Sequence, residues 1–166
     1  MNKKTIYTIF SAGAAIIFLA ILIFIAGPKN GNANKIADKI SAISTQEKLF
    51  DFGSISMAAG KVSHIFKIKN SISQSMNIKK ISTSCMCTSA TLIINGEKTG
   101  PFGMPMHGIT PEVNKSLAAG EEAEIEVIFD PAAHGPSGIG EIKRSVFVED
   151  SFGGNLELQF YANVKP

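Results

Sequence analysis

The sequence lacks tryptophan and has only two cysteines among its 166 residues. Two cysteines cannot supply the set of cross-links that holds small disulfide-rich scaffolds together. Charged residues make up 18% of the chain, the formal net charge is +2, and no run of lysine or arginine is longer than a pair. This balance argues against electrostatic binding of nucleic acid. The chain also lacks a Gly-rich phosphate loop and the HExxH and GxSxG motifs, so no motif indicates an enzyme.

An uncharged apolar run lies close to the N-terminus. No charged residue occurs from Thr5 to Pro28, and residues 6–26 are almost wholly apolar. About 20 apolar residues, rising 1.5 Å each in a helix, cross a hydrocarbon core roughly 30 Å thick. We therefore predict a cytoplasmic stub at residues 1–4 and a single transmembrane helix, acting as a signal anchor, at residues 5–27.

The signal-like arrangement of this run predicts its orientation. Lys3 and Lys4 precede it, as in the positively charged start of a signal peptide, whereas the lysines that follow make the charge asymmetry weak. A cleaved signal peptide usually has an apolar stretch of about 7 to 15 residues, so a retained anchor is favoured over cleavage near Ala26–Gly27. In both cases the chain after Pro28 is expected outside the cytoplasm, in the periplasm or at the cell surface.

The remainder divides into a linker and one domain. Residues 28–46 are polar, small and rich in Gly and Asn at first, which is typical of a linker. Residues 47–166 are expected to form an extracytoplasmic domain. The segment 31–166 holds 13 basic and 14 acidic residues, so the basic balance of the whole chain comes from the anchor's flanks.

Alternation of apolar and polar residues predicts β-strands throughout this domain. Seven runs rich in Ile, Val and Phe are separated by turn residues such as Asn95–Gly96. The predicted strands are 48–55, 61–70, 76–82, 90–94, 122–130, 143–150 and 156–164. We predict an all-β, immunoglobulin-like antiparallel sandwich of about seven strands, preceded by the transmembrane helix. The core tryptophan and the inter-sheet cysteine pair of true immunoglobulin domains are missing.

Two features qualify this strand pattern. His64 shares a predicted strand face with Val62 and Phe66, so we interpret it as a packed structural histidine. Two stretches, Ser82–Thr88 and Asn95–Ser116, do not follow the strand rhythm, and the second is predicted to be a long loop. Loops of that length are uncommon in compact domains and often carry function.

The two cysteines form a Cys-x-Cys motif, Cys85-Met86-Cys87. In an extended strand, residues i and i+2 point to one face with Cβ atoms roughly 6 to 7 Å apart. That spacing is long for a disulfide, whose Cβ atoms lie about 3.8 Å apart. The motif is therefore expected to hold two thiolates that converge on one metal ion, or two reactive thiols side by side.

Further soft ligands follow downstream. Met104, Met106 and His107 fall within four residues, and His134 lies in a Gly/Pro turn directly after a predicted strand. Thiolate, thioether and imidazole together are ligands that Cu(I) prefers. Zinc would instead take Cys85, Cys87, His107 and His134 as a tetrahedral set and leave the methionines unused. Copper is the expected metal, and zinc is the alternative.

Plainer interpretations remain open for each of these residues. The cysteines can serve as two small hydrophobic side chains, Met104 and Met106 can pack a loop against the sandwich, and each histidine can cap a turn. A cysteine nucleophile would need a histidine base and an orienting partner, and no spacing in the sequence fixes such an arrangement. A redox pair would lack the usual thioredoxin-like βαβ scaffold. We therefore expect no enzyme.

Several segments together resemble a known bacterial family. They are LFDFGSI, VSHIFKIKNS, KKISTSCMCTSA and LAAGEEAEIEVIFDP, in that order. They resemble the domain of unknown function 1573, whose members are similar to Hydin-like, immunoglobulin-like sandwiches, and the resemblance covers about residues 47–164. Many members carry Gly between the two cysteines, where this chain has Met86. The family implies an exported or lipid-anchored sandwich without an assigned biochemical role.

The expected function is therefore metal binding, most simply of copper, by a membrane-anchored sandwich outside the cytoplasm. The expected ligands are Cys85, Cys87, His107 and His134, with Met104 and Met106 as supplementary ligands. The alternative from another class is an interaction module that docks a protein of the cell envelope, with structural Cys and His. A thiol redox protein is a third interpretation. The membrane is the one partner expected in every case.

Overall fold

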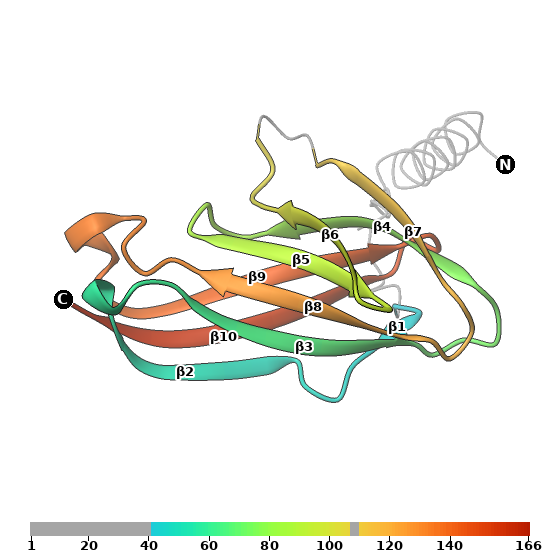
Figure 1. Cartoon of the computed structure of the whole chain (residues 1–166), viewed down its shortest axis with the longest axis horizontal. Coiled ribbons are helices and arrows are strands. Elements are labelled where there is room, and N and C mark those ends of the chain that lie inside the picture. Colours follow the sequence, from blue (N-terminus) through green and yellow to red (C-terminus); the bar gives the residue numbers. More distant parts are fainter. Residues whose placement is uncertain (1–40, 107–109) are drawn as a thin grey trace, which may run out of the picture. The chain divides into compact units, whose positions relative to one another are not determined.

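The computed structural model describes residues 41–106 and 110–166 (Figure 1). The predicted anchor at 5–27 lies outside the described residues, as do most of the predicted linker and His107. None of the helical segments in the described part of the chain has the length and apolar character that a membrane crossing requires.

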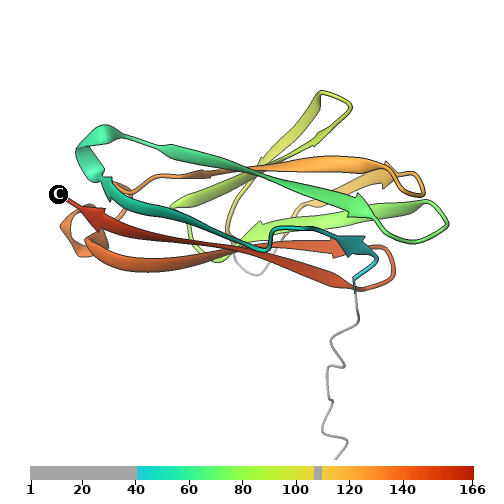
Figure 2. The same cartoon turned by 90° about the horizontal axis from the view of Figure 1, so that it is seen from below.

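The described residues form ten strands in two five-stranded sheets that stack as two layers (Figure 2). The first sheet has the order β1-β3-β8-β5-β6, with β1 Ile43–Ser44, β3 Val62–Asn70, β8 Glu122–Phe129, β5 Thr88–Ile94 and β6 Glu97–Phe102. The second has the order β2-β10-β9-β4-β7, with β2 Leu49–Ser56, β10 Asn155–Lys165, β9 Gly140–Asp150, β4 Met76–Thr83 and β7 Glu112–Leu117. Two short 3-10 helices, η1 Met57–Ala59 and η2 Gly135–Gly138, complete the described elements.

The hydrophobic core lies between the two sheets, as the alternating pattern predicts. Along β8, Ala123, Ile125 and Val127 are buried while the intervening glutamates reach toward solvent. Phe160 on β10 is fully buried in the opposite sheet and contacts Phe129 with ring centroids 5.4 Å apart. Every buried side-chain nitrogen and oxygen atom in the described segments has a hydrogen-bond partner, so the core holds no unpaired side-chain polar group there.

The prediction of an all-β, two-sheet sandwich is confirmed, but two of its details are wrong. The described residues form ten strands where about seven were predicted, and the sandwich is not wholly antiparallel because β2 pairs with β10 in parallel. Alternation reveals that a segment is a strand, yet it carries no information on which partner the strand meets or in which direction. The parallel pairing of the first long strand with the last one is therefore invisible in the sequence pattern.

The predicted long loop at Asn95–Ser116 is also wrong. Asn95 and Gly96 adopt φ values of 51° and 84°, which suit a tight hairpin turn, and they return the chain into β6 against β5. Later in the same stretch, β7 pairs with β4. Both are edge strands with exposed Lys and Glu side chains, so they lack the apolar alternation that marks strands paired on both sides.

The start of the domain is held by one buried carboxylate. Asp150, fully buried at the end of β9, accepts hydrogen bonds from Ser41 Oγ at 3.0 Å and from the amide of Ala42 at 2.8 Å through Oδ2. Its Oδ1 accepts from the amides of Phe152 and Gly154, both at 2.9 Å. Ser41 and Ala42 precede β1, which lies inside the predicted linker, so the sandwich includes this part of the predicted linker.

Candidate metal centre

Cys85, Met86 and Cys87 occupy the tight turn that carries the chain from β4 in one sheet to β5 in the other. The amide of Thr88 donates to the carbonyl of Cys85 at 3.1 Å and closes the turn. The Thr83 hydroxyl lies 2.9 Å from the same carbonyl. The motif falls outside the strands, as expected, but the spacing of an extended strand does not hold for its cysteines. The chain bends here to cross between the layers, and the cysteine Cα atoms lie 5.3 Å apart.

The turn is attached to both neighbouring strands. The amide of Ser84 donates to the carbonyl of Ser145 on β9 at 2.9 Å, and the amide of Ser145 donates back to Ser84 Oγ at the same distance. On the other side, the amide of Asp130 donates to the carbonyl of Cys87 at 2.9 Å. Because hydrogen bonds hold the backbone on both sides of the motif, the Cα positions of the two cysteines are fixed.

A second turn, which follows β8, brings His134 to the cysteines. The Asp130 carboxylate accepts from the amide of Ala132 at 3.0 Å and shapes the start of this turn. Gly135 has a φ of 55°, a conformation that favours glycine, and η2 begins there. A Cβ atom at Gly138 would lie 3.3 Å from His134 Cβ, so the helix packs closely against the histidine.

These two turns place three ligand atoms together. Cys85 Sγ, Cys87 Sγ and His134 Nε2 all lie within 4.8 Å of one another, with Cys85 Sγ and His134 Nε2 3.1 Å apart. Cys87 is buried, Cys85 is half-buried and His134 is exposed. The two sulfur atoms are joined as a disulfide in this structure. In the dithiol state the same three residues could hold a metal ion.

Arg144 is a further residue of the site, which the sequence reasoning missed. Its Nε donates to Cys87 Sγ at 3.4 Å, and its Nη1 donates to the carbonyl of Lys143 at 2.8 Å. The Lys143-Arg144 pair is visible in the sequence at the start of a predicted strand. No spacing rule connects it with cysteines about 57 positions earlier, because the pairing of β4 with β9 brings them together.

The other predicted ligands lie in the segment that follows β6. Met104 and Met106 follow β6 and are 44% and 74% exposed, so their thioethers are accessible to solvent. The carbonyl of Gly103 accepts from the amide of Thr83 at 3.2 Å, which ties the beginning of this segment to the end of β4. His107 lies outside the described residues.

His64 is separate from the candidate metal centre. Its ring stacks on Phe50 with centroids 3.6 Å apart and meets Phe66 edge-on at 4.7 Å. Its Nε2 lies 2.9 Å from a carboxylate oxygen of Glu47. These contacts agree with the interpretation of His64 as a packed structural residue.

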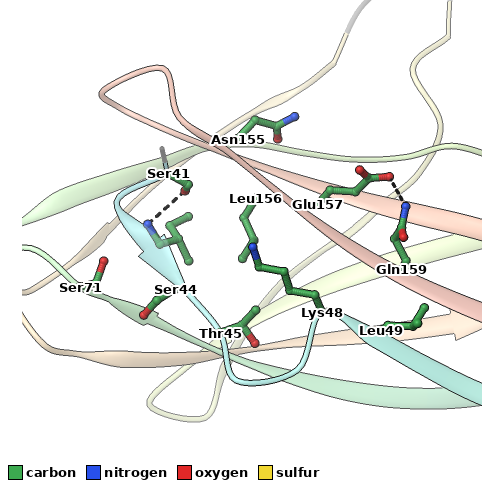
Figure 3. Close-up of a pocket in the computed structure, with 11 residues that line it drawn as sticks. Ser41, Ser44, Thr45, Lys48, Leu49, Ser71, Asn155, Leu156, Glu157 and Gln159 are labelled. Atoms are coloured by element: carbon green, nitrogen blue, oxygen red, sulfur yellow. Dashed lines mark hydrogen bonds between the residues drawn. The ribbon is translucent and has the colours of Figure 1, made fainter. Parts of the chain in front are cut away.

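Several hollows lie on the surface of the sandwich, and two of them bear on the site. The larger, of about 690 Å³, is formed by β1, the start of β2 and β10, and Figure 3 shows that Ser, Thr and Asn side chains and Lys48 surround it. None of the predicted metal ligands lines it. A smaller hollow of about 390 Å³ lies between η2 and β9, and His134 and Arg144, which both contact the cysteine sulfurs, are part of its wall.

The sequence match to known families centres on the first half of the sandwich. Residues 43–100 match the family described as "Protein of unknown function (DUF1573)". The match includes Cys85 and Cys87, and it confirms the family resemblance over this segment. No curated protein gives a significant sequence match.

Solved structures share the fold at low sequence identity. A protein of unknown function from Porphyromonas gingivalis W83 superposes with a TM-score of 0.53 and 10% identity, over 80% of this chain and 51% of that chain. This chain thus spans about half the length of that protein. The PapD-like domain 7 of human CEP192 follows at TM-score 0.47 and 11% identity, over 76% and 87% of the two chains. The periplasmic chaperone SfaE has TM-score 0.41 and 11% identity, over 75% and 58%.

Proposed function

We propose that this protein binds a soft metal ion, Cu(I), through Cys85, Cys87 and His134. The observation that carries the proposal is the convergence of two sulfur atoms and one imidazole nitrogen within 4.8 Å, from turns that are 49 positions apart. Thiolates and imidazole are ligands of both Cu(I) and Zn(II). The ion would bind the dithiol state, in which both sulfurs are free to act as ligands.

The charge of Arg144 favours Cu(I) over Zn(II). Two thiolates and one Cu(I) ion carry a net charge of −1, whereas two thiolates and one Zn(II) ion are neutral. The guanidinium, 3.4 Å from Cys87 Sγ, balances the anionic copper complex and leaves the zinc complex with an excess positive charge. Zinc also requires a fourth ligand, for which His107 is the candidate from the sequence.

Because of the exposed methionines, we further propose that the protein passes Cu(I) on to another molecule. Met86 stands between the two ligand cysteines at the tip of the turn and is 71% exposed, and Met106 is 74% exposed. Thioethers are weak, soft ligands that suit a transient contact with Cu(I). We place the transfer outside the cytoplasm, with residues 5–27 as the membrane anchor.

The position of the site on the sandwich fits such a role. Ser41, where the described chain begins, is bound to Asp150 at the end of β9, whereas Cys87 contacts Arg144 six residues earlier on that strand. Six residues of a strand span about 20 Å. The ligands therefore lie far along β9 from Ser41 and Asp150.

The test is a titration of the reduced full chain with Cu(I) and with Zn(II), each against a chelator that competes for the ion. We expect one equivalent of Cu(I), lost in the Cys85→Ser/Cys87→Ser double variant and weakened at least tenfold in His134→Ala, a typical loss for one ligand-shell residue. His64→Ala is the matched control, since this histidine lies outside the centre. It should keep the full stoichiometry.

Three results would count against the proposal. Tighter binding of zinc would overturn the copper assignment and retain the site. Equal affinity in His134→Ala and wild type would remove the histidine from the ligand set. If the folded protein binds neither metal, the metal-binding function fails, and the interaction module becomes the better explanation of the sandwich.

A further inference from the structure

We infer that the oxidised site has an activity of its own: the Cys85–Cys87 disulfide accepts two electrons from a dithiol, with Cys85 as the sulfur that is attacked and Cys87 as the sulfur that leaves. This inference is independent of metal binding, since it concerns the state in which the two sulfurs are bonded to each other. It rests on the different surroundings of the two sulfur atoms.

Access distinguishes the two cysteines. Cys87 is only 3% exposed and lies in the core cluster between the sheets, whereas Cys85 is half-buried at the edge of that cluster. A thiolate attacks a disulfide in line with the sulfur–sulfur bond, so the sulfur that solvent reaches is the one that can be approached. The geometry therefore directs attack to Cys85 Sγ.

The charges around the two sulfur atoms also favour Cys85 as the sulfur that is attacked and Cys87 as the sulfur that leaves. Arg144 Nε donates to Cys87 Sγ at 3.4 Å, and the Thr88 hydroxyl lies 3.7 Å from the same atom. A permanent positive charge beside a departing sulfur stabilises the thiolate that forms there, and a better leaving thiolate departs faster. Cys85 Sγ has no arginine or lysine neighbour within the described contacts: it accepts from the amide of Cys87 at 3.3 Å and lies 3.1 Å from His134 Nε2, neither of which carries the permanent charge of a guanidinium.

The reaction balances with a dithiol as the only co-reactant. One substrate thiolate bonds to Cys85 Sγ, the Cys85–Cys87 bond breaks, and its electron pair stays on Cys87 as a thiolate beside Arg144. The second substrate thiol, as thiolate, then displaces Cys85 from the mixed disulfide. The substrate leaves as a disulfide, and Cys85 departs as a thiolate. The two protons given up by the substrate thiols balance the two cysteine thiolates, so the pair has gained two electrons and two protons as a dithiol. The wall of the hollow of about 390 Å³ contains His134 and Arg144, which contact the two sulfurs, so this hollow is where we expect the substrate to bind.

The loop that this disulfide closes is short, which indicates that the disulfide is not a stabilising cross-link. It joins residues two positions apart, and cross-links over so few residues restrict the unfolded chain little. The turn is already fixed by backbone bonds through Ser84 and Asp130. Opening the disulfide therefore leaves the surrounding structure in place, as a reversible electron acceptor requires.

The experiment follows reduction of the oxidised full chain by dithiothreitol in metal-free buffer, with free thiols alkylated at timed intervals and counted by mass spectrometry. In Arg144→Met the rate constant should fall about tenfold, the effect expected from losing one charge-assisted hydrogen bond. Arg144→Lys keeps the charge and should recover most of the rate. Lys143→Met, next to it on the same strand, is the matched control and should react like wild type.

A second pair of variants tests the assignment of the two sulfurs without depending on Arg144. Each variant keeps one cysteine, and its thiol is treated with a small aromatic disulfide. The Cys87→Ser variant keeps Cys85, and the Cys85→Ser variant keeps Cys87. We expect Cys85 to form the mixed disulfide at least tenfold faster than Cys87, because Cys87 is buried. Equal rates in these two variants, or an Arg144→Met rate equal to wild type, would overturn the inference. So would a full chain that stays a dithiol in oxidised glutathione. Metal titration of the reduced protein is a separate readout, so the two proposals can fail independently.

Discussion

The first half of β9 and its final residue contrast in how they use polar side chains, and we call them its open end and its closed end. At its final residue, the Asp150 carboxylate is fully buried, and both oxygens are occupied by backbone amides and one hydroxyl. In the first half of the strand, Arg144 contacts Cys87, while Cys85 contacts the exposed His134 on the adjacent turn. One strand thus carries two polar networks: a closed one, whose groups are buried and fully hydrogen-bonded, and an open one, which includes an exposed side chain.

This contrast separates structural polar groups from groups available for chemistry. A carboxylate whose acceptor sites are all filled by the chain itself has no capacity left for a ligand, and its loss leaves buried donors unpaired. Sulfur and imidazole atoms that mainly contact each other can exchange those contacts for a metal ion or an incoming thiol. The two ends should therefore respond to substitution in opposite ways.

The largest effect on stability is expected at the closed end. Asp150→Ala should lower the free energy of unfolding by about 3 kcal/mol, because the amides of Ala42 and Gly154 lose their acceptor in a buried place. Chemical denaturation of the full chain, followed by circular dichroism, measures this loss. Metal binding at the other end of the strand should keep its stoichiometry.

Asp51→Ala is the matched control for this variant. Asp51 is an exposed aspartate that accepts a single backbone bond, from the amide of Gly53 at 2.8 Å. Its removal should cost less than about 1 kcal/mol. A loss at Asp150 no larger than at Asp51 would show that the closed network does not hold the start of the domain.

The sequence pattern predicts the sandwich well because burial follows alternation. His64 and Phe66 on β3 and Ile125 on β8 face inward as their spacing requires. It fails for β6 and β7, since edge strands with exposed charged residues need no apolar alternation. It also fails for the parallel pairing of β2 with β10, which depends on where the chain returns and not on local composition.

The site is predicted only in part, for a related reason. Cys85, Cys87 and His134 are found from their chemistry alone, and the structure brings them together. Arg144 is an ordinary basic residue in the sequence, and only the packing of the β4–β5 turn against β9 gives it a role. The bend at Cys85 is likewise set by the crossing from one sheet to the other.

A smaller effect on stability is expected at the open end. Cys85→Ala/Cys87→Ala removes all thiol chemistry, yet it should lower the free energy of unfolding by only about 1.5 kcal/mol relative to the oxidised protein, the value expected for so short a loop. Denaturation of the oxidised wild type and the double variant measures the difference. A loss as large as that of Asp150→Ala would mean that the disulfide is a structural cross-link, and the contrast between the two ends would disappear.

The smallest effect on stability is expected at Glu157, whose hydrogen bond to Ser145 lies next to the open end. The Ser145 hydroxyl donates to the Glu157 carboxylate at 2.6 Å, and this bond, aided by Gln159, lowers the pKa of Glu157 below its usual 4.5. A lowered pKa in the folded state means that the ionised form stabilises the fold above about pH 4.5. That contribution is lost as the pH falls through the folded-state pKa.

Glu157→Gln should therefore be slightly less stable than wild type at pH 7, and the difference should shrink as the pH is lowered from 5 to 3. Denaturation at each pH measures the difference, and an NMR titration of the Glu157 carboxyl group gives its pKa directly.

Ser145 also pairs through its backbone with Ser84, directly before the cysteines. If acidification releases the Ser145–Glu157 bond without changing the rate of disulfide reduction by a neutral phosphine, the turn is held by its backbone bonds alone. A reduction rate that followed the titration of Glu157 would show instead that the open end depends on this side-chain bond.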